Sequence, residues 1–303
     1  MAWAATLSLV LAFLTVGFLG AYRYVDGFWL YRGFPPPRDP AYVRVQGTQQ
    51  TIYVRSPALG GRRQQVVVYL PPGYALNRQH YPVLYLLHGF PGNPGGLLQT
   101  LRMGVLVDSL MAKGRIHGVI LVAPFGSTGT FTDKEWANGL RPNEAWETFV
   151  ARDVVNAIDA RYRTVHAGAG RAIAGLSEGG YGALNIALHH PGEFRVIESW
   201  SGYMLADNIP AIFGRRPAML AYNSPAKYLP KVAPALRRHR TSVWFYTGSK
   251  DTLLGQNRAF AAELRRNRIP YVFFVDPGGH TWKIWRGNAE AALLAATTRM
   301  RGG

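Results

Sequence analysis

From about residue 48 onward, short apolar runs alternate with stretches of helical periodicity, and this alternation defines the class of fold. Eight runs have the length and composition of strands, namely Gln49–Arg55, Gln64–Leu70, Val83–His88, Gly118–Pro124, Ala172–Ser177, Val196–Gly202, Ser242–Gly248 and Tyr271–Pro277. The later runs, such as Val-Leu-Tyr-Leu-Leu at residues 83–87, are continuously apolar, as expected for strands buried on both faces of a sheet. The sequence predicts an α/β fold with an eight-stranded, mostly parallel sheet flanked by helices.

Two local patterns refine this prediction. Gly60 and Gly61 separate the first two runs, which are therefore expected to form an antiparallel lead-in. The clearest helix starts near Glu144, because the apolar residues after it recur at helical spacing. They are Trp146, Phe149, Val150, Val154, Ile158 and Tyr162.

The strongest functional signal is Gly175-Leu176-Ser177-Glu178-Gly179, which lies between an apolar run and a predicted helix over residues 181–189. At a strand-to-helix turn, Gly-x-Ser-x-Gly forms a nucleophile elbow, where the serine is strained and exposed and the glycines leave room for the turn. A plain Gly/Ser turn could have the same sequence, but the flanking strand and helix favour the elbow. Ser177 is therefore the candidate nucleophile.

A serine nucleophile needs a histidine base and an orienting acid, which in α/β hydrolases follow it in the order acid, then histidine. Asp251 follows the seventh predicted strand and His280 follows the eighth, so they are the candidate acid and base. Asp276 competes for the acid role, but it is too close to His280 in sequence to reach the far ring nitrogen easily. The sequence thus predicts a Ser177–His280–Asp251 triad.

The oxyanion hole is expected to combine the backbone N–H of Glu178 with one from the loop after the third strand. Phe90 is the expected second donor, because Pro91 has no N–H. His88, Trp282 and Trp285 are the expected lining of the substrate pocket.

No metal and no cofactor are expected. The chain has no cysteine and no His-Glu-x-x-His sequence. Gly168-Ala169-Gly170 resembles the start of a dinucleotide fingerprint, but it precedes its strand and lacks the third glycine.

Several segments together resemble the esterase family of α/β hydrolases that includes esterase D and the antigen 85 mycolyltransferases. They extend over roughly residues 60–290 and comprise Val68–Tyr74, Tyr85–Gly89, Trp146–Phe149, the elbow around Ser177, Ser199–Gly202 and His280–Trp285. The resemblance implies carboxylesterase or acyltransferase chemistry without a metal, and a location outside the bacterial cytoplasm. It also assigns Ser177, Asp251 and His280 to the triad, and Phe90 and Glu178 to the oxyanion hole.

The chain departs from the mycolyltransferases at His88–Pro91, where they carry Asp-Gly-Leu-Arg, a sequence that helps to hold trehalose. Trehalose mycolyl transfer is therefore not expected, and the general esterase branch is the closer likeness.

The leading hypothesis is a serine carboxylesterase that acts on a small-molecule, lipid or cell-envelope ester. An acyltransferase that moves an acyl group to a sugar or lipid hydroxyl, and a non-catalytic binding domain on a hydrolase fold, remain as alternatives.

The N-terminal segment predicts a membrane anchor. Ala2–Tyr22 contains no charged residue, and at about 1.5 Å per residue a helix of this length would span the roughly 30 Å of a hydrocarbon core. An uncleaved anchor is favoured over a signal peptide, because no Lys or Arg precedes the run. Trp29 and Tyr31 could form an interfacial belt, and Phe34–Pro37 a stiff spacer. The expected organisation is an anchor at 1–25, a linker at 26–47 and a catalytic domain at 48–303.

The chain has 34 Lys and Arg against 17 Asp and Glu, a net charge of +17, which suits an anionic neighbour. Residues 207–268 hold 12 of these basic residues, and we expect them to form a basic cap at the substrate entrance that attracts an anionic envelope surface. A solvated face without a role is the alternative. Nucleic-acid binding is not expected, because no recognised module is present. Arg23 and Arg32 favour a cytoplasmic domain by the positive-inside rule, whereas the family resemblance favours the extracytoplasmic side.

Overall fold

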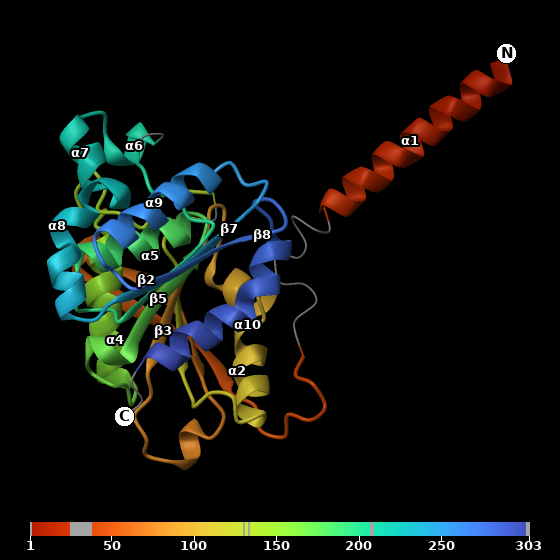
Figure 1. Ribbon diagram of the computed structural model, residues 1–303. Helices are drawn as coiled ribbons and strands as arrows, with labels where there is room; N and C mark the ends of the chain where they lie inside the picture. Colours follow the sequence, from red (N-terminus) through yellow and green to blue (C-terminus); the bar gives the residue numbers. More distant parts are fainter. Residues whose placement is uncertain (1, 25–37, 130, 133, 207–208, 301–303) are drawn as a thin grey trace.

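The computed structural model describes residues 2–24, 38–129, 131–132, 134–206 and 209–300. The expected aromatic belt at Trp29 and Tyr31 and the spacer Phe34–Pro37 lie outside these ranges. The described residues include a separate N-terminal helix and an α/β domain (Figure 1).

The domain is built on one eight-stranded sheet with the order β1-β2-β4-β3-β5-β6-β7-β8. β1 pairs antiparallel with β2 and β2 with β4, whereas all other neighbours are parallel. All eight predicted strands are confirmed, with ends that differ by at most two residues. Their bounds are β1 Thr48–Ser56, β2 Arg62–Leu70, β3 Val83–Leu87, β4 Ile120–Pro124, β5 Arg171–Leu176, β6 Val196–Trp200, β7 Ser242–Gly248 and β8 Tyr271–Asp276.

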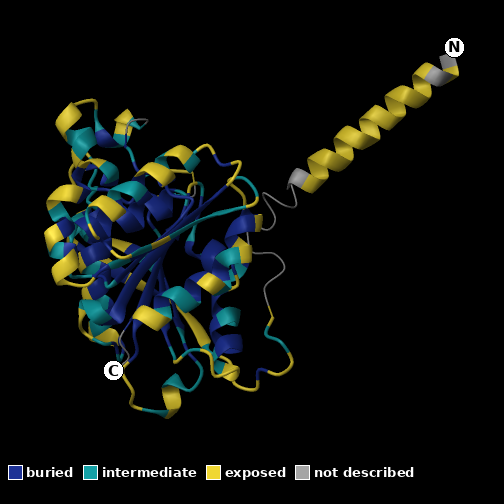
Figure 2. Cartoon of the chain, viewed as in Figure 1, coloured by how far each residue is buried: buried dark blue, intermediate teal, exposed yellow. Residues whose placement is uncertain are grey.

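Helices cover both faces of the sheet, whose central strands are buried between them (Figure 2). Alternate residues of each central strand contribute to the two cores. One face carries α3 (Trp146–Thr148), the π-helical η5 (Phe149–Val154), α4 (Val155–Arg161), α5 (Glu178–His189), α8 (Pro225–Arg238) and α9 (Leu254–Arg266). The other carries the π-helical η4 (Gly96–Thr100), α2 (Met103–Ala112) and α10 (Trp282–Arg299). Short 3-10 turns lie at Pro57–Leu59, Tyr74–Leu76 and Gly168–Gly170.

The helix expected near Glu144 begins at Trp146 and runs through η5 into α4. All six residues of its predicted apolar face are buried. Its π-helical middle part was not predicted, because a single wide turn leaves the apolar spacing nearly unchanged.

The parallel strands β3 and β5 to β8 end at one edge of the sheet, termed here the carboxyl edge. The loops that carry Ser177, Asp251 and His280 all follow these strand ends, so the topology alone gathers the three residues.

A cap, defined here as residues 203–206 and 209–224, also leaves the carboxyl edge, after β6, and contains α6 (Pro210–Phe213) and α7 (Pro217–Tyr222). The expectation that the whole basic stretch 207–268 forms a cap is wrong. α8 and α9 pack on the sheet and run back to its opposite edge, because they connect parallel strands.

Six exposed arginines gather at that opposite edge, where α8 and α9 end. The guanidinium of Arg237 donates to the backbone oxygen of Asn267 at 2.7 Å and so joins the two helix ends. Arginine at helix C-termini also complements the helix dipole, which explains part of this pattern. The arginine surface comprises Arg237, Arg238, Arg240, Arg265, Arg266 and Arg268.

The N-terminal helix α1 (Ala2–Tyr24) has the length and apolar character of a membrane span, a character that signal sequences share. It is the one such helix among the described residues. Residues 38–47 pack beside α2, where the backbone N–H of Gly47 donates to Asp108 at 3.1 Å and Val43 is buried. The last part of the expected linker is therefore joined to the domain.

Candidate active site

Ser177 occupies a strained turn between β5 and α5. Its φ of 55° and ψ of −118° lie in a region that residues with a side chain rarely adopt. The turn is held by the backbone N–H of Ser177, which donates to the oxygen of Trp200 on β6 at 2.9 Å. Gly179 is required beside it, since a Cβ there would lie 2.1 Å from the oxygen of Leu87. These are the features of the predicted nucleophile elbow.

His280 lies between Ser177 and Asp251. Its Nε2 is 2.8 Å from the Oγ of Ser177, and its Nδ1 is 2.9 Å from Oδ2 of Asp251. The histidine side chain is 36% exposed, whereas that of Asp251 is fully buried. The structure thus brings the three predicted residues into one hydrogen-bonded chain that starts in the interior and ends at an accessible hydroxyl.

The ionisation of Asp251 follows from its contacts. Burial opposes the charged form, but hydrogen bonds from His280 and from the backbone N–H of Leu253 outweigh it and hold the pKa of Asp251 below its usual value. The carboxylate therefore stays ionised and accepts a proton-bearing Nδ1. That tautomer leaves a lone pair on Nε2, which faces the Ser177 hydroxyl.

Asp276 points elsewhere. Its Oδ2 accepts a hydrogen bond from the side-chain amide of Asn288 on α10 at 2.7 Å.

Trp285, from the first turn of α10, packs edge-on against the ring of His280, with 4.9 Å between the centroids. Trp282 packs edge-on against Trp285 in turn, and both tryptophans are buried. The two residues expected to line the pocket thus support the histidine ring.

The loop after β3, which is expected to supply part of the oxyanion hole, passes directly over the elbow. A Cβ on Gly89 would lie 3.2 Å from that of Ser177, so the absence of a side chain allows the close approach. Phe90, the next residue, is 44% exposed. The amide of Glu178 is at the first turn of α5, where the helix dipole favours negative charge. Both expected donors therefore adjoin the nucleophile.

His88 lies beneath this loop and is 4% exposed. Its Nε2 accepts from the backbone N–H of Gly126 at 3.1 Å, and its Nδ1 lies 2.9 Å from the oxygen of Gly89. Burial lowers the pKa of His88 to about 4, so the ring is neutral and donates from Nδ1. The indole of Trp136 donates to the oxygen of His88 at 3.0 Å. Sequence reasoning missed Trp136, because nothing in an irregular loop predicts which residue folds under it.

The cap packs over the first turn of α5. Tyr203 stacks on Tyr181 with 4.3 Å between ring centroids, and Phe213 packs edge-on against the same ring. A cavity of about 180 Å³ lies between α6 and the loop 134–146. Among the described residues, no cluster of three or more His, Asp or Glu side chains is arranged to hold a metal ion.

This fold, with this arrangement of serine, histidine and aspartate at the carboxyl edge, is that of the α/β hydrolases. The family model described as "Putative esterase" matches residues 56–296, and the chain belongs to that family.

Three comparisons show the range of relatives. The chain is 34% identical over 138 residues to an endo-1,4-beta-xylanase/feruloyl esterase of Xylanibacter ruminicola, which covers 44% of this chain and 19% of that protein. It is 27% identical over 287 residues to the diacylglycerol acyltransferase/mycolyltransferase Ag85A of Mycobacterium leprae, with 81% of each chain covered. Among solved structures, a ferulic acid esterase superposes with a TM-score of 0.73 and 28% identity, over 84% of this chain and 100% of that one.

Proposed function

We propose that this protein is a serine carboxylesterase. The main support for this proposal is the continuous chain of hydrogen bonds from the buried Asp251 through His280 to the accessible hydroxyl of Ser177. Membership of the esterase family supports the proposal.

In the first half of the reaction, the Oγ of Ser177 attacks the ester carbonyl carbon while Nε2 of His280 takes the hydroxyl proton. Negative charge moves to the carbonyl oxygen, where the N–H groups of Glu178 and Phe90 stabilise it. Asp251 stabilises the imidazolium that has formed. The intermediate collapses as the ester C–O bond breaks, and the imidazolium gives its proton to the departing alcohol.

In the second half, His280 takes a proton from a water that attacks the acyl group on Ser177. The C–O bond between the acyl carbon and Oγ of Ser177 then breaks, which releases the carboxylic acid, and the His280 imidazolium returns its proton to Ser177. An alcohol in place of this water would give acyl transfer, and the similarity to the Ag85A mycolyltransferase supports that alternative. Hydrolysis and transfer are separated by product analysis with and without an added acceptor alcohol.

The test of the site is Ser177→Ala. We expect ester hydrolysis to fall by several orders of magnitude and labelling by a fluorophosphonate to disappear, with an unchanged circular dichroism spectrum. Wild-type turnover of 4-nitrophenyl acetate by this variant would refute the assignment. A wild-type protein that neither labels nor hydrolyses any ester would instead favour the non-catalytic binding domain. Hydroxycinnamoyl esters belong in the substrate panel because two of the relatives are named as feruloyl or ferulic acid esterases.

We further propose that α1 anchors the domain to a membrane and that the domain lies outside the cytoplasm. The length and apolar character of α1 support the anchor, and the location implied by the family resemblance in the sequence supports the side. The arginine surface suits an anionic envelope surface. Since it lies opposite the carboxyl edge, contact there would leave the active site open rather than line its entrance.

A further inference from the structure

Trp136 lies under the loop that follows β3. The residue is fully buried, and its indole N–H donates to the backbone oxygen of His88 at 3.0 Å. The indole also packs edge-on against the His88 ring, with 4.9 Å between the centroids. Trp136 therefore holds both the backbone and the side chain of the first residue of this loop.

His88 in turn fixes the next peptide of the loop. Its Nε2 accepts from the backbone N–H of Gly126, so the neutral ring carries its proton on Nδ1 and donates it to the oxygen of Gly89. The peptide between Gly89 and Phe90 is trans, so its carbonyl oxygen and its N–H point to opposite sides. Since the oxygen points to the buried His88 ring, the N–H of Phe90 points away from the interior.

Gly89 makes these two hydrogen bonds necessary. Glycine rotates freely about φ and ψ, so the loop backbone alone does not determine which way its peptides face. A glycine is required here, because a Cβ would lie 2.7 Å from the side chain of Leu176 and 3.2 Å from the Cβ of Ser177. The bond from Trp136 fixes the peptide before Gly89, and the bond from His88 fixes the peptide after it.

Trp136 also contacts the elbow helix. A Cβ on Gly182 of α5 would lie 2.6 Å from the Cβ of Trp136, and a Cβ on Gly126, after β4, would lie 2.4 Å from the indole ring. Trp136 thus fills the space that side chains at these two positions would need. α5 begins with Glu178, whose N–H is the other expected oxyanion donor. One buried residue therefore contacts both the loop and the helix that carry the expected donors.

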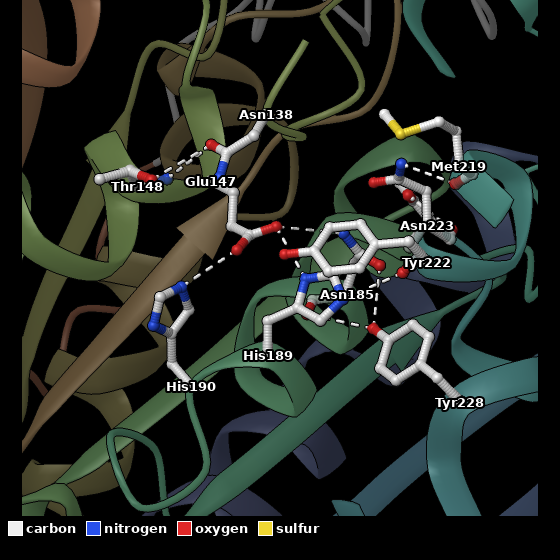
Figure 3. Close-up of polar contacts among 11 residues, drawn as sticks. Asn138, Glu147, Thr148, Asn185, His189, His190, Met219, Tyr222, Asn223 and Tyr228 are labelled. Carbon is white, nitrogen blue, oxygen red and sulfur yellow. Dashed lines mark hydrogen bonds and ion pairs between the residues drawn. The ribbon is translucent and has the colours of Figure 1, made fainter. Parts of the chain in front are cut away.

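The backbone of Trp136 is strained. Its φ is 50°, in the left-handed region that a bulky residue rarely adopts. Two hydrogen bonds fix the chain that follows it. The backbone N–H of Trp146 donates to the oxygen of Ala137 at 3.2 Å, and that of Thr148 donates to Oδ1 of Asn138 at 3.1 Å (Figure 3). Such strain persists only where the surrounding structure fixes it, and it is concentrated at functional sites.

We propose that Trp136 is a positioning residue of the oxyanion hole, which holds the loop after β3 so that the N–H of Phe90 faces the developing oxyanion. This inference rests on the proposed esterase function, because acyl transfer is what places negative charge at that N–H. The ester carbonyl of the bound substrate carries much less charge than the oxyanion and depends less on the donor. Loss of the indole N–H should therefore lower kcat and leave KM nearly unchanged.

The first test compares Trp136→Phe with the matched control Trp146→Phe, both in the full chain in detergent micelles. Trp146 is also buried, and its indole donates to Oε2 of Glu144 at 2.7 Å, so each change removes one indole hydrogen bond. For 4-nitrophenyl acetate, we expect kcat to fall about tenfold in Trp136→Phe, with KM within about twofold of the wild type. Both constants of Trp146→Phe should stay within about twofold. Equal losses of kcat in the two variants would overturn the inference.

A substrate with sulfur in place of the carbonyl oxygen separates a role in the oxyanion hole from a general loss of structure. Sulfur is larger and accepts N–H hydrogen bonds more weakly, so 4-nitrophenyl thionoacetate gains less from the hole. We expect Trp136→Phe to lower the ratio of kcat/KM for the acetate to kcat/KM for the thionoacetate about fivefold. Trp146→Phe should leave this ratio unchanged. A wild-type ratio in Trp136→Phe would overturn the inference, whatever the loss of rate.

Gly182→Ala is a second variant that leaves the tryptophan itself unaltered. The added methyl group displaces Trp136 from the side of α5, so we expect the same fall in kcat and in the ratio. Its control is Gly255→Ala on α9, where a Cβ would extend into open space. If Trp136→Phe does not fold, Gly182→Ala decides alone, and wild-type constants in it would refute the role of Trp136.

Hydrogen exchange followed by mass spectrometry tests the loop without catalysis. The amides of residues 88–92 should exchange faster in Trp136→Phe than in the wild type and in Trp146→Phe, because the peptides around Gly89 are no longer fixed. Unchanged exchange would overturn the inference even if activity falls. Faster exchange in a chain whose wild type hydrolyses no ester would support the positioning of the loop and refute the esterase function instead.

Discussion

Replacing Asp251 by Asn should abolish most of the activity without altering the shape of the site. The carboxylate is fully buried and accepts from Nδ1 of His280 at 2.9 Å. An asparagine amide in its place can donate to Nδ1, which moves the ring proton to Nε2. Nε2 would then face the Ser177 hydroxyl, 2.8 Å away, with a proton instead of a lone pair, and could not act as a base. In serine proteases the corresponding change lowers kcat about 10⁴-fold, which is about 5.5 kcal/mol of transition-state stabilisation.

The matched control is Asp276→Asn, because Asp276 also lies near His280 in sequence but bonds Asn288. We expect kcat/KM for 4-nitrophenyl acetate to fall about 10⁴-fold in Asp251→Asn and less than about threefold in Asp276→Asn. Assays from pH 6 to 9, with the number of active sites counted by fluorophosphonate in the wild type, remove differences in folding and concentration. Equal losses in the two variants, or a larger loss at Asp276, would refute the assignment of the acid.

Three further outcomes are expected. Trp285→Ala should lower the free energy of unfolding by about 3–5 kcal/mol in chemical denaturation, because it removes a buried indole. It should also lower kcat, because the indole packs against His280. A loss of stability with unchanged kcat would show that this contact does not position the histidine ring. Burial beside the carboxyl of Asp39 raises the pKa of Asp108 to about 6, so its neutral form stabilises the fold below about pH 4 and this contribution is lost as the pH rises through 6. The melting temperature of the wild type should therefore fall relative to Asp108→Asn between pH 4 and 7, and a constant difference would contradict the shift. The domain of residues 40–303 should sediment with anionic but not zwitterionic vesicles at low salt, and serine at the six positions of the arginine surface should remove this preference; sedimentation that survives the change would place the contact elsewhere.

The fold could be predicted closely because each strand of a buried parallel sheet has a continuous apolar sequence of its own. Val83–Leu87 and Ile120–Pro124 are buried along their whole length, and runs this short favour a strand over a helix. It was harder to predict at which end of the sheet the charged residues of a helix would lie. The arginines at the ends of α8 and α9 were expected near the substrate, because the stretch that follows β6 was interpreted as one insertion. Only the pairing of β6 with β7 and of β7 with β8 shows that those helices lead away from the site.

The nucleophile, acid and base could be located for a related reason. Each follows directly on a recognisable strand end, so its place in the sheet order determines its place in space. The pocket residues have no such constraint. His88, Trp282 and Trp285 are expected in the pocket, but all three are buried, and they support the loop after β3 or the histidine ring. Glu147 and His189 are 42 residues apart, and no sequence pattern predicts that one carboxylate will meet two histidines.

Two carboxylate–histidine pairs, at His280 and at His189, show how the third partner determines the role of an imidazole. In both, Nδ1 bonds a buried carboxylate, Asp251 in one case and Glu147 in the other. At His280 the group facing Nε2 is a hydroxyl, which can donate, so the neutral ring can accept a proton and return it. At His189 it is the backbone carbonyl oxygen of Tyr222, which has no proton to give, so the ring has no partner from which Nε2 could take one. The same pair of residue types is therefore suited to proton transfer at the start of α5 and to a structural contact between α3, α5 and α7 at its end.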